Sequence, residues 1–282
     1  MKRIFCTVVI VSTIIFSFCF TSCNTIRGNG EIVKIEQQLS QFDKISSNDA
    51  FDVIIYYSDT YKVIVEAESN LLPYILTTVN DHKLTIRTKS NIIFNSYKNV
   101  KVHVYCKTVE DINNNGSGNI YADEIITSDD LEIAVRGSGN IEIDNISQCN
   151  DLDLKVTGSG NLKINYVDHC KDCDISINGS GGCSINDFSN DDLEVSINGS
   201  GGVNLAGSSY FATLKINGSG KYNSYDLRTN IYDIRINGSG NSYITVTDKL
   251  IVKINGSGDV YYKGSPLMEV TGGGSGKVIS KN

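Results

Sequence analysis

The sequence predicts an all-β protein whose main body is a parallel β-helix, or β-solenoid, with rungs of roughly 20 residues. The first observation behind this prediction is a Gly-Ser-Gly tripeptide that recurs to the C-terminus. Its copies begin at Gly116, Gly137, Gly158, Gly179, Gly199, Gly218, Gly238, Gly256 and Gly274. Successive copies lie 18 to 21 residues apart, and a short, regular period of this kind is typical of solenoids in which each repeat stacks on its neighbours.

The second observation is an alternation of apolar and polar residues on both sides of the tripeptide. Two residues before it stand Val135, Val156, Ile177, Ile197, Ile216, Ile236 and Ile254. Four residues after its start stand Ile120, Ile141, Leu162, Cys183 and Val203. Period-two alternation rich in β-branched residues predicts strands with one buried face, so each repeat is expected to contribute two strands to a common core.

The third observation is that helical periodicity is missing. No window places apolar residues at i, i+3, i+4 and i+7 over three turns, and glycine recurs too often for a helix. Parallel strands ~4.8 Å apart fit instead. Gly-Ser-Gly is then expected at a corner, where glycine either takes a positive φ or lets two backbones approach closely. The asparagines just before it are expected to form a hydrogen-bonded ladder: Asn115, Asn178, Asn198, Asn217, Asn237 and Asn255.

The chain begins like an exported lipoprotein. Lys2 and Arg3 precede a mostly apolar run that is followed by Thr21-Ser22-Cys23. This predicts a signal peptide over residues 1–22 and a lipid on Cys23, although Phe20 stands where an aliphatic residue is usual. An uncleaved membrane anchor and cleavage without lipidation are the alternatives, and the first is disfavoured because the run is short and interrupted by polar residues. Each of these exports the rest of the chain.

The remaining chain divides into three parts. Residues 23–30 are predicted as the lipidated N-terminus and a short tether, residues 31–112 as an N-terminal β region, and residues 113–282 as the Gly-Ser-Gly repeat β-helix. The β region alternates over 51–57, 61–66, 83–88 and 100–105 but lacks the repeat. A cap is expected there, because a bare terminal rung exposes apolar surface and unpaired strand edges.

The charge of the chain excludes some partners. The formal net charge is −7, and removing residues 1–22 takes away Lys2 and Arg3 but no acid, which makes it −9. An acidic body without a basic stripe argues against nucleic acid as a partner and against electrostatic binding to anionic lipid headgroups. Membrane attachment is therefore expected through the lipid on Cys23.

Several sequence features together resemble a known family. They are the lipoprotein-type leader, an N-terminal pattern Phe51-Asp-Val-Ile-Ile, Tyr61-Lys-Val-Ile-Val and Lys83-Leu-Thr-Ile, and the serial Ile-Asn-Gly-Ser-Gly repeats. Over residues 31–280 the chain resembles the autotransporter-adhesin head-domain family, or GIN domain, of Gram-negative bacteria. The resemblance implies a β-helical, adhesin-like protein of the cell envelope, held as an outer-membrane lipoprotein on its periplasmic or surface face. It supplies no catalytic motif.

Five cysteines follow Cys23: Cys106, Cys149, Cys170, Cys173 and Cys183. Cys170 and Cys173 form a single C-x-x-C, a weak metal or redox signal, and Cys173 and Cys183 stand in apolar columns, which favours buried thiols. Cys149 and Cys170 each lie 12 residues after the start of their own tripeptide. They are expected to stack on adjacent rungs, within the distance that a disulfide tolerates, either bridged or as paired thiols.

Acidic residues recur seven and five residues before four successive tripeptides. They are Asp130, Glu132, Asp151, Asp153, Asp172, Asp174, Asp192 and Glu194. Odd offsets face outward in the register set by the core, so these carboxylates are expected to form two acidic ladders on one face. One interpretation is a solvated acidic face. The other is a surface that binds Ca²⁺ or a cationic partner.

Two functions follow from these observations. The first is a non-enzymatic, adhesin-like binding or surface-scaffold module without a cofactor, whose protein or glycan partner the sequence does not name. The alternative is a carbohydrate-active β-helix enzyme, a polysaccharide lyase or glycosidase, which needs positioned carboxylates in a groove. No catalytic triad or zinc pair is visible, no repeat carries an insertion that would build groove walls, and the chain has no Trp to stack on sugars. These features favour the binding module.

Overall fold

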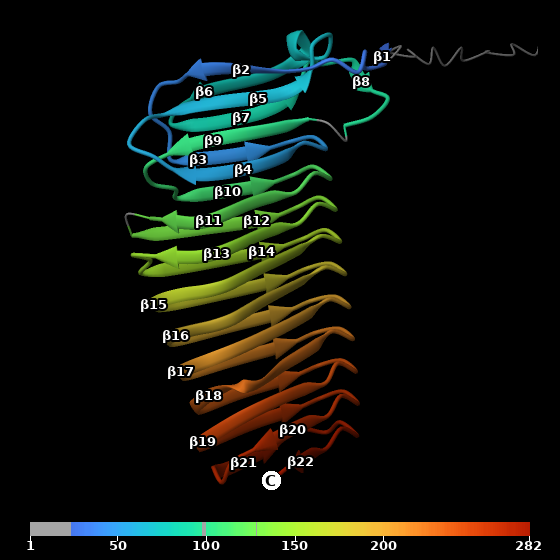
Figure 1. Cartoon of the computed structure of the whole chain (residues 1–282). Helices are drawn as coiled ribbons and strands as arrows, with labels where there is room; N and C mark the ends of the chain where they lie inside the picture. Colours follow the sequence, from blue (N-terminus) through green and yellow to red (C-terminus); the bar gives the residue numbers. More distant parts are fainter. Residues whose placement is uncertain (1–23, 98–99, 128) are drawn as a thin grey trace, which may run out of the picture.

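The computed structural model describes residues 24–97, 100–127 and 129–282. It shows a tall stack of β-strand rungs with the N-terminal region at one end and the C-terminus at the other (Figure 1). In these residues the one helical element is a short 3-10 helix, η1 (Leu72–Tyr74). The same part of the chain contains no helix with the length and apolar character needed to cross a membrane. The predicted all-β parallel β-helix is confirmed.

In the described residues, the N-terminal region contains nine strands that mix parallel and antiparallel pairing. They are β1 (Asn24–Ile26), β2 (Ile32–Gln38), β3 (Lys44–Ser47), β4 (Asp52–Tyr57), β5 (Lys62–Glu68), β6 (Ile75–Asn80), β7 (Lys83–Thr88), β8 (Ile92–Phe94) and β9 (Lys101–Cys106). Strand β5 pairs antiparallel with β2 and β9, and β6 pairs antiparallel with β7. Strands β3 and β4 run parallel to the first strands of the repeats, so the cap already contains the first rung of the solenoid.

The repeats follow as a continuous parallel stack. Their strands are β10 (Asp111–Asn114), β11 (Ile120–Ile126), β12 (Asp130–Val135), β13 (Ile141–Ser147), β14 (Asp151–Val156), β15 (Asn161–Ile177), β16 (Gly182–Ile197), β17 (Gly202–Ile216), β18 (Lys221–Ile236), β19 (Ser242–Ile254), β20 (Val260–Lys263), β21 (Leu267–Thr271) and β22 (Val278–Ser280). From β15 to β19 one long strand passes through both walls of each rung, and its pairing register shifts at the bend.

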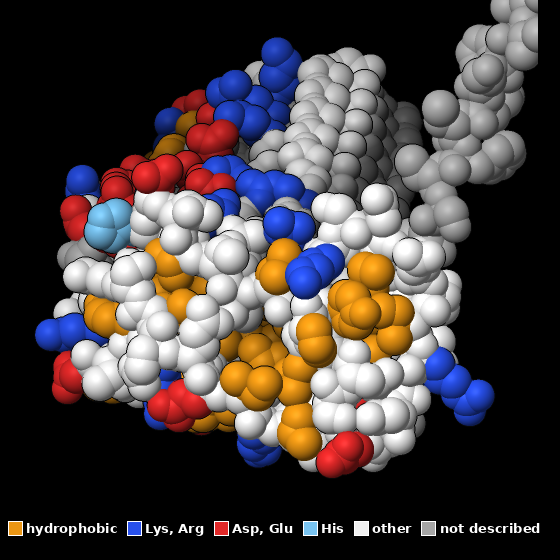
Figure 2. Space-filling model, turned by 90° about the horizontal axis from the view of Figure 1, so that it is seen from above, with side chains coloured by type: hydrophobic (Ala, Val, Ile, Leu, Met, Phe, Trp, Pro, Cys, Tyr) orange, Lys and Arg blue, Asp and Glu red, His pale blue; other side chains and the backbone are white. Residues whose placement is uncertain are grey.

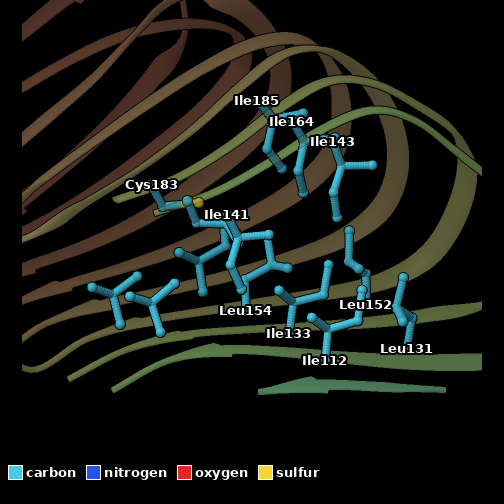
Figure 3. Close-up of a cluster of buried hydrophobic side chains, with 14 of the residues drawn as sticks. Ile112, Leu131, Ile133, Ile141, Ile143, Leu152, Leu154, Ile164, Cys183 and Ile185 are labelled. Carbon is cyan, nitrogen blue, oxygen red and sulfur yellow. The ribbon is translucent and has the colours of Figure 1, made fainter. Parts of the chain in front are cut away.

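The core lies between the two walls of the solenoid. The inward residues predicted from the alternation are buried, with Val135, Ile177 and Ile236 fully shielded from solvent. Figure 3 shows Ile133 and Leu154 on one wall and Ile143 and Ile164 on the other, all pointing into the interior. Burying an aliphatic side chain contributes about 1.5–3 kcal/mol, so these continuous columns are the main source of stability.

The Gly-Ser-Gly corner depends on close stacking of backbones. A Cβ atom added to Gly137 would overlap the carbonyl oxygen of Gly116 in the rung before it. Positive φ is not the reason for glycine at this corner, because the glycines in the described residues with positive φ stand elsewhere: Gly30, Gly207, Gly264 and Gly272. Of the two explanations offered for the corner glycines, close approach is therefore the right one.

The asparagine ladder forms along the later corners. Asn198 donates to Asn178, Asn217 to Asn198, Asn237 to Asn217 and Asn255 to Asn237, with N–O distances of 2.7–2.8 Å. Asn115 instead donates to Ser46 and Asn48 of the cap. It does not join the ladder because Arg136 and Thr157 occupy the two corners between Asn115 and Asn178.

The segment predicted as a tether is part of the fold. Strand β1 pairs in parallel with β8, and the backbone N–H of Asn24 donates to the carbonyl of Asn91 at 2.9 Å. The side chain of Asn29 donates to Ser69, and Asn70 donates to the carbonyl of Arg27. Residues 24–30 are thus held against the cap by hydrogen bonds over much of their length.

Candidate functional site

The acidic residues are positioned by the first strand of each repeat. In β12, β14 and the C-terminal halves of β15 and β16, buried Leu, Ile, Val or Cys alternates with outward Asp or Glu. The register pairs Asp130 with Asp151, Asp151 with Asp172, and Asp172 with Asp192. It also pairs Glu132 with Asp153, Asp153 with Asp174, and Asp174 with Glu194. All eight residues form the two predicted ladders, which we call the acidic ladders.

A shallow groove of about 840 Å³ runs along the acidic ladders. All eight carboxylate residues line it, together with Lys44, Glu110, Asp111 and Asp129. Figure 2 shows Asp and Glu side chains gathered on one side of the molecule, with Lys and Arg side chains beside them. The groove is therefore an acidic surface that extends over several rungs.

Basic residues neutralise part of this charge. The Nζ atom of Lys155 lies 2.5 Å from Asp153 and 3.4 Å from Glu132, and its hydrogen bond to Asp153 raises the pKa of Lys155. At the last acidic rung, Lys215 lies 2.5 Å from Glu194. Because the carboxylates outnumber these cations, the groove keeps an excess of negative charge.

Desolvation and the crowding of carboxylates raise the pKa values of two groups in the groove. The pKa of Asp174 is raised by burial and then by the neighbouring charges of Glu194 and Asp153. The pKa of Asp192 is raised by desolvation and by Asp172. Raised pKa values mean that the fold disfavours the charged forms of these groups. A cationic ligand in the groove would relieve that cost.

The groove contains residues that sequence reasoning missed. Asp111 of β10 pairs in register with Glu132 and extends its ladder by one rung, and burial raises the pKa of Asp111. Asp111 lies five residues before Gly116, the same offset as the other members of its column, so the repeat spacing could have found it. Beyond Asp111 the charge of the column changes from negative to positive, because Lys44 of β3 and Lys83 of β7 follow in register.

The metal and cysteine hypotheses find less support. Across the described ranges, no three or more His, Cys, Asp or Glu side chains are arranged to hold a metal ion. Cys149 and Cys170 are buried and are not bridged in this structure. A disulfide between them in an oxidising envelope stays a prediction. Burial raises the pKa of Cys149 and of Cys183 to about 12, which makes them weak nucleophiles. Cys23 lies outside the described residues.

An aromatic column lies on the later rungs. The rings of Tyr243 and Tyr261 stack with their centroids 5.0 Å apart, and Tyr225 meets Tyr243 edge-on. The ammonium group of Lys221 lies over the ring of Tyr243, and that of Lys281 lies over the ring of Tyr261. Since neighbouring rings and lysines cover these faces, the column offers little free aromatic surface for stacking on a sugar.

The sequence matches a family over most of its length. Residues 41–201 and 154–266 match the family described as "Putative auto-transporter adhesin, head GIN domain". The chain belongs to this family. The family resemblance seen in the N-terminal pattern and the Ile-Asn-Gly-Ser-Gly repeats is therefore confirmed. No curated protein matches the chain at a significant level.

Solved structures share this GIN-domain fold. A putative adhesin from Parabacteroides merdae is 24% identical, with a TM-score of 0.67 over 92% of this chain and 99% of its own. A putative adhesin from Parabacteroides distasonis is 21% identical, with a TM-score of 0.73 over 91% and 100%. A protein from the same species described as a putative lipid binding protein is 25% identical, with a TM-score of 0.67 over 92% and 100%.

Proposed function

We propose that this GIN-domain protein is a non-enzymatic, adhesin-like binding module, exported and held by a lipid on Cys23 at the outer membrane of a Gram-negative bacterium. Its family and two of the three solved relatives above are named as putative adhesins, which supports a role in surface binding. The leader with Cys23 supports export and lipidation. The rigid stack of rungs would act as a scaffold that presents its outward side chains at fixed spacing.

The groove along the acidic ladders is the proposed binding surface, and its ligand is a cationic partner. The observation that carries this proposal is the register of eight carboxylates on four consecutive rungs. Like charges paired across strands are destabilising by a few tenths to about 1 kcal/mol. This repulsion adds to the desolvation that raises the pKa values of Asp174 and Asp192. A basic polypeptide segment or a row of hard cations would offset it by pairing with the carboxylates.

Calorimetric titration of the mature protein tests this proposal. The two probes are CaCl₂ and an oligolysine peptide, each at low ionic strength and again at high ionic strength, because salt screens exposed charges. Binding is expected to weaken strongly in the Asp153→Asn/Asp174→Asn variant. The matched control is Glu142→Gln/Asp187→Asn, which removes two exposed carboxylates from the other wall. Equal heats in both variants would exclude the groove as the binding surface.

The enzyme alternative also has an observation in its favour. The acidic ladders place carboxylates side by side, and the raised pKa of Asp174 is a property expected of a general acid. A panel of acidic and neutral polysaccharides, assayed for new reducing ends and for unsaturated uronates, tests this function. We expect no turnover. Turnover by the wild-type protein that is lost in the Asp174→Asn variant would contradict the binding module and support a lyase or glycosidase.

Lipidation has a separate test. Cells fed an alkyne-labelled fatty acid should incorporate the label into the full-length protein, which should float with membranes. The Cys23→Ala variant should lose the label and appear in the soluble fraction of the envelope. An unlabelled wild-type protein would contradict the proposed anchor.

A further inference from the structure

The exposed aliphatic side chains of this molecule gather at its two ends. In the described residues, the large hydrophobic side chains that are strongly exposed between the ends are all tyrosines. The aliphatic ones at the N-terminal end are Ile32 (44% exposed), Ile35 (52%) and Ile93 (45%). Leu267, Met268 and Val270 lie at the C-terminal end, on β21. Each end therefore presents apolar surface that the long walls of the solenoid do not.

The N-terminal end is built from β2, β1 and β8. Strand β2 pairs on one side with β5, and among the described residues no strand pairs with its other side, so β2 is the outermost strand of its wall. Strands β1 and β8 form a small separate sheet beside it. Figure 2 looks onto this end and shows apolar side chains gathered across its middle. We call this surface the N-terminal end face.

The position of Asn24, the residue after the proposed lipid-bearing cysteine, indicates what covers this face. Cys23 is one peptide bond from Asn24, and consecutive Cα atoms are about 3.8 Å apart. Asn24 itself is fixed in β1 by its pairing with Ile92 and by its hydrogen bond to Asn91. A lipid on Cys23 would therefore enter the bilayer directly beside the N-terminal end face, with no free linker to hold the protein away.

The charges of this end suit a lipid surface of low net charge. Lys34 pairs with Glu66 at 3.0 Å and Lys62 pairs with Glu36 at 3.2 Å. Because these two lysines already have carboxylate partners, they add little attraction to anionic headgroups. Apolar side chains at an interface sink to the boundary between headgroups and acyl chains, and three exposed isoleucines next to an acyl anchor fit that environment.

We infer that the N-terminal end face lies on the bilayer and that the solenoid stands upright from it, with the C-terminal rung farthest from the membrane. This inference rests on the proposed lipid on Cys23. It goes beyond anchoring, because an anchored protein on a flexible tether could lie in any orientation. The acidic ladders would then run along the membrane normal, open to partners on one side.

Tryptophan fluorescence tests the orientation, because the chain has no native Trp. Full-length lipidated protein carrying Ile35→Trp is reconstituted into phosphatidylcholine vesicles whose acyl chains are brominated close to the headgroup. Its emission should be quenched several-fold more strongly than that of the matched Leu267→Trp protein at the opposite end. Adding Ile93→Asp to the Ile35→Trp protein should reduce the quenching, whereas adding Val270→Asp should not.

Neutron reflectivity on a supported bilayer gives a second, independent measure. In the described residues the longest wall has thirteen strands, in the order β2, β5, β9, β4, β11, β13, β15, β16, β17, β18, β19, β20 and β22. At ~4.8 Å per strand spacing, an upright molecule gives a protein layer about 58 Å thick. A molecule lying on its side gives a much thinner layer.

The outcomes separate the inference from the function on which it rests. Protein that floats with vesicles but shows equal quenching at positions 35 and 267, or a thin layer, overturns the upright orientation and leaves the anchor intact. Protein that carries no lipid and does not float overturns the anchor and the orientation together. Selective quenching at position 35 with a layer of the expected thickness supports both.

Discussion

The acidic rungs, from β12 to β16, and the later rungs, from β17 to β19, have the same fold but differ in the charge of their outward columns. Both bury Leu, Ile and Val in the same inward columns. In the outward columns, however, the register carries Asp192 to Phe211 and Glu194 to Thr213, and the acidic ladders end there. A basic column begins beside that point, with Lys215, Arg235 and Lys253 in register. The fold therefore depends on the inward columns, and the outward columns are free to carry function.

The largest effect is expected from a charge placed in the shared core. Ile197→Asp in an acidic rung and Ile236→Asp in a later rung should each lower the free energy of unfolding by about 3–5 kcal/mol, because each buries an unpaired carboxylate. Outward Ser196→Asp should change it far less. Urea denaturation of the three variants checks this. A large difference between the two core variants would mean that the two regions do not share one core.

A smaller effect is expected at a buried cluster of hydroxyl groups in the later rungs. The buried hydroxyls of Tyr222 and Tyr232 lie 2.8 Å apart, and Ser224 lies 3.1 Å from Tyr232. Tyr232→Phe should cost about 1–2 kcal/mol, because it leaves the hydroxyl of Tyr222 buried without this partner. The Tyr222→Phe/Tyr232→Phe double variant should recover part of the loss. Thermal melts of the three proteins decide, and additive losses would exclude coupling between the rings.

The corner ladder gives the next effect. Asn217→Ala removes a hydrogen bond to Asn198 and another from Asn237, and exposed bonds of this kind contribute about 0.5–1 kcal/mol. Thr157→Ala at the equivalent corner of an acidic rung, where the ladder is interrupted, should have little effect. Chemical denaturation of both variants provides the measurement. Equal losses would show that the asparagine ladder does not stabilise the later rungs.

The smallest effect has the opposite sign. Asp174→Asn should stabilise the protein at neutral pH by a few tenths of a kcal/mol, because it removes a partly desolvated carboxylate and its repulsion from Glu194 and Asp153, which solvent and salt already weaken. Since the fold raises the pKa of Asp174, the gain should disappear below pH 3.8, where this carboxyl is protonated in both states. Asp233→Asn, which breaks the ion pair with Arg235, should give no gain. Melting temperatures measured from pH 3 to pH 8 test both.

Much of the fold and of the acidic site could be predicted because the repeat turns sequence offsets into spatial neighbours. Counting from Gly-Ser-Gly was enough to stack Asp130 on Asp151 and Glu132 on Asp153. The same counting would have found Asp111, whose strand lies before the first tripeptide. Periodicity therefore predicts pairing between residues about 20 positions apart.

The cap could not be predicted in this way, because its pairings follow no repeated offset. Strand β1 pairs with β8, which joins Asn24 to Ile92 across most of the cap. Strands β4 and β5 are neighbours in sequence, but both pair with β9 instead of with each other. Such partners are chosen by long-range packing, which leaves little trace in local alternation. For the same reason, local alternation does not predict the pairing of residues 24–26 with β8.

The stacking of Gly137 on the carbonyl of Gly116 also limits how the length of this rod can change. Each corner can stack on the rung before it only where its own residue is glycine, because an added Cβ would overlap the carbonyl oxygen beneath it, whether that carbonyl belongs to Gly116 or, at the first corner, to Asp49. Duplicating or deleting one whole period keeps every corner intact and alters the height by a single step of ~4.8 Å. A partial insertion would bring a side chain against a backbone carbonyl. The height of this solenoid can therefore change only by whole rungs. Evolution can lengthen or shorten the molecule in equal steps while the packing of its core stays the same.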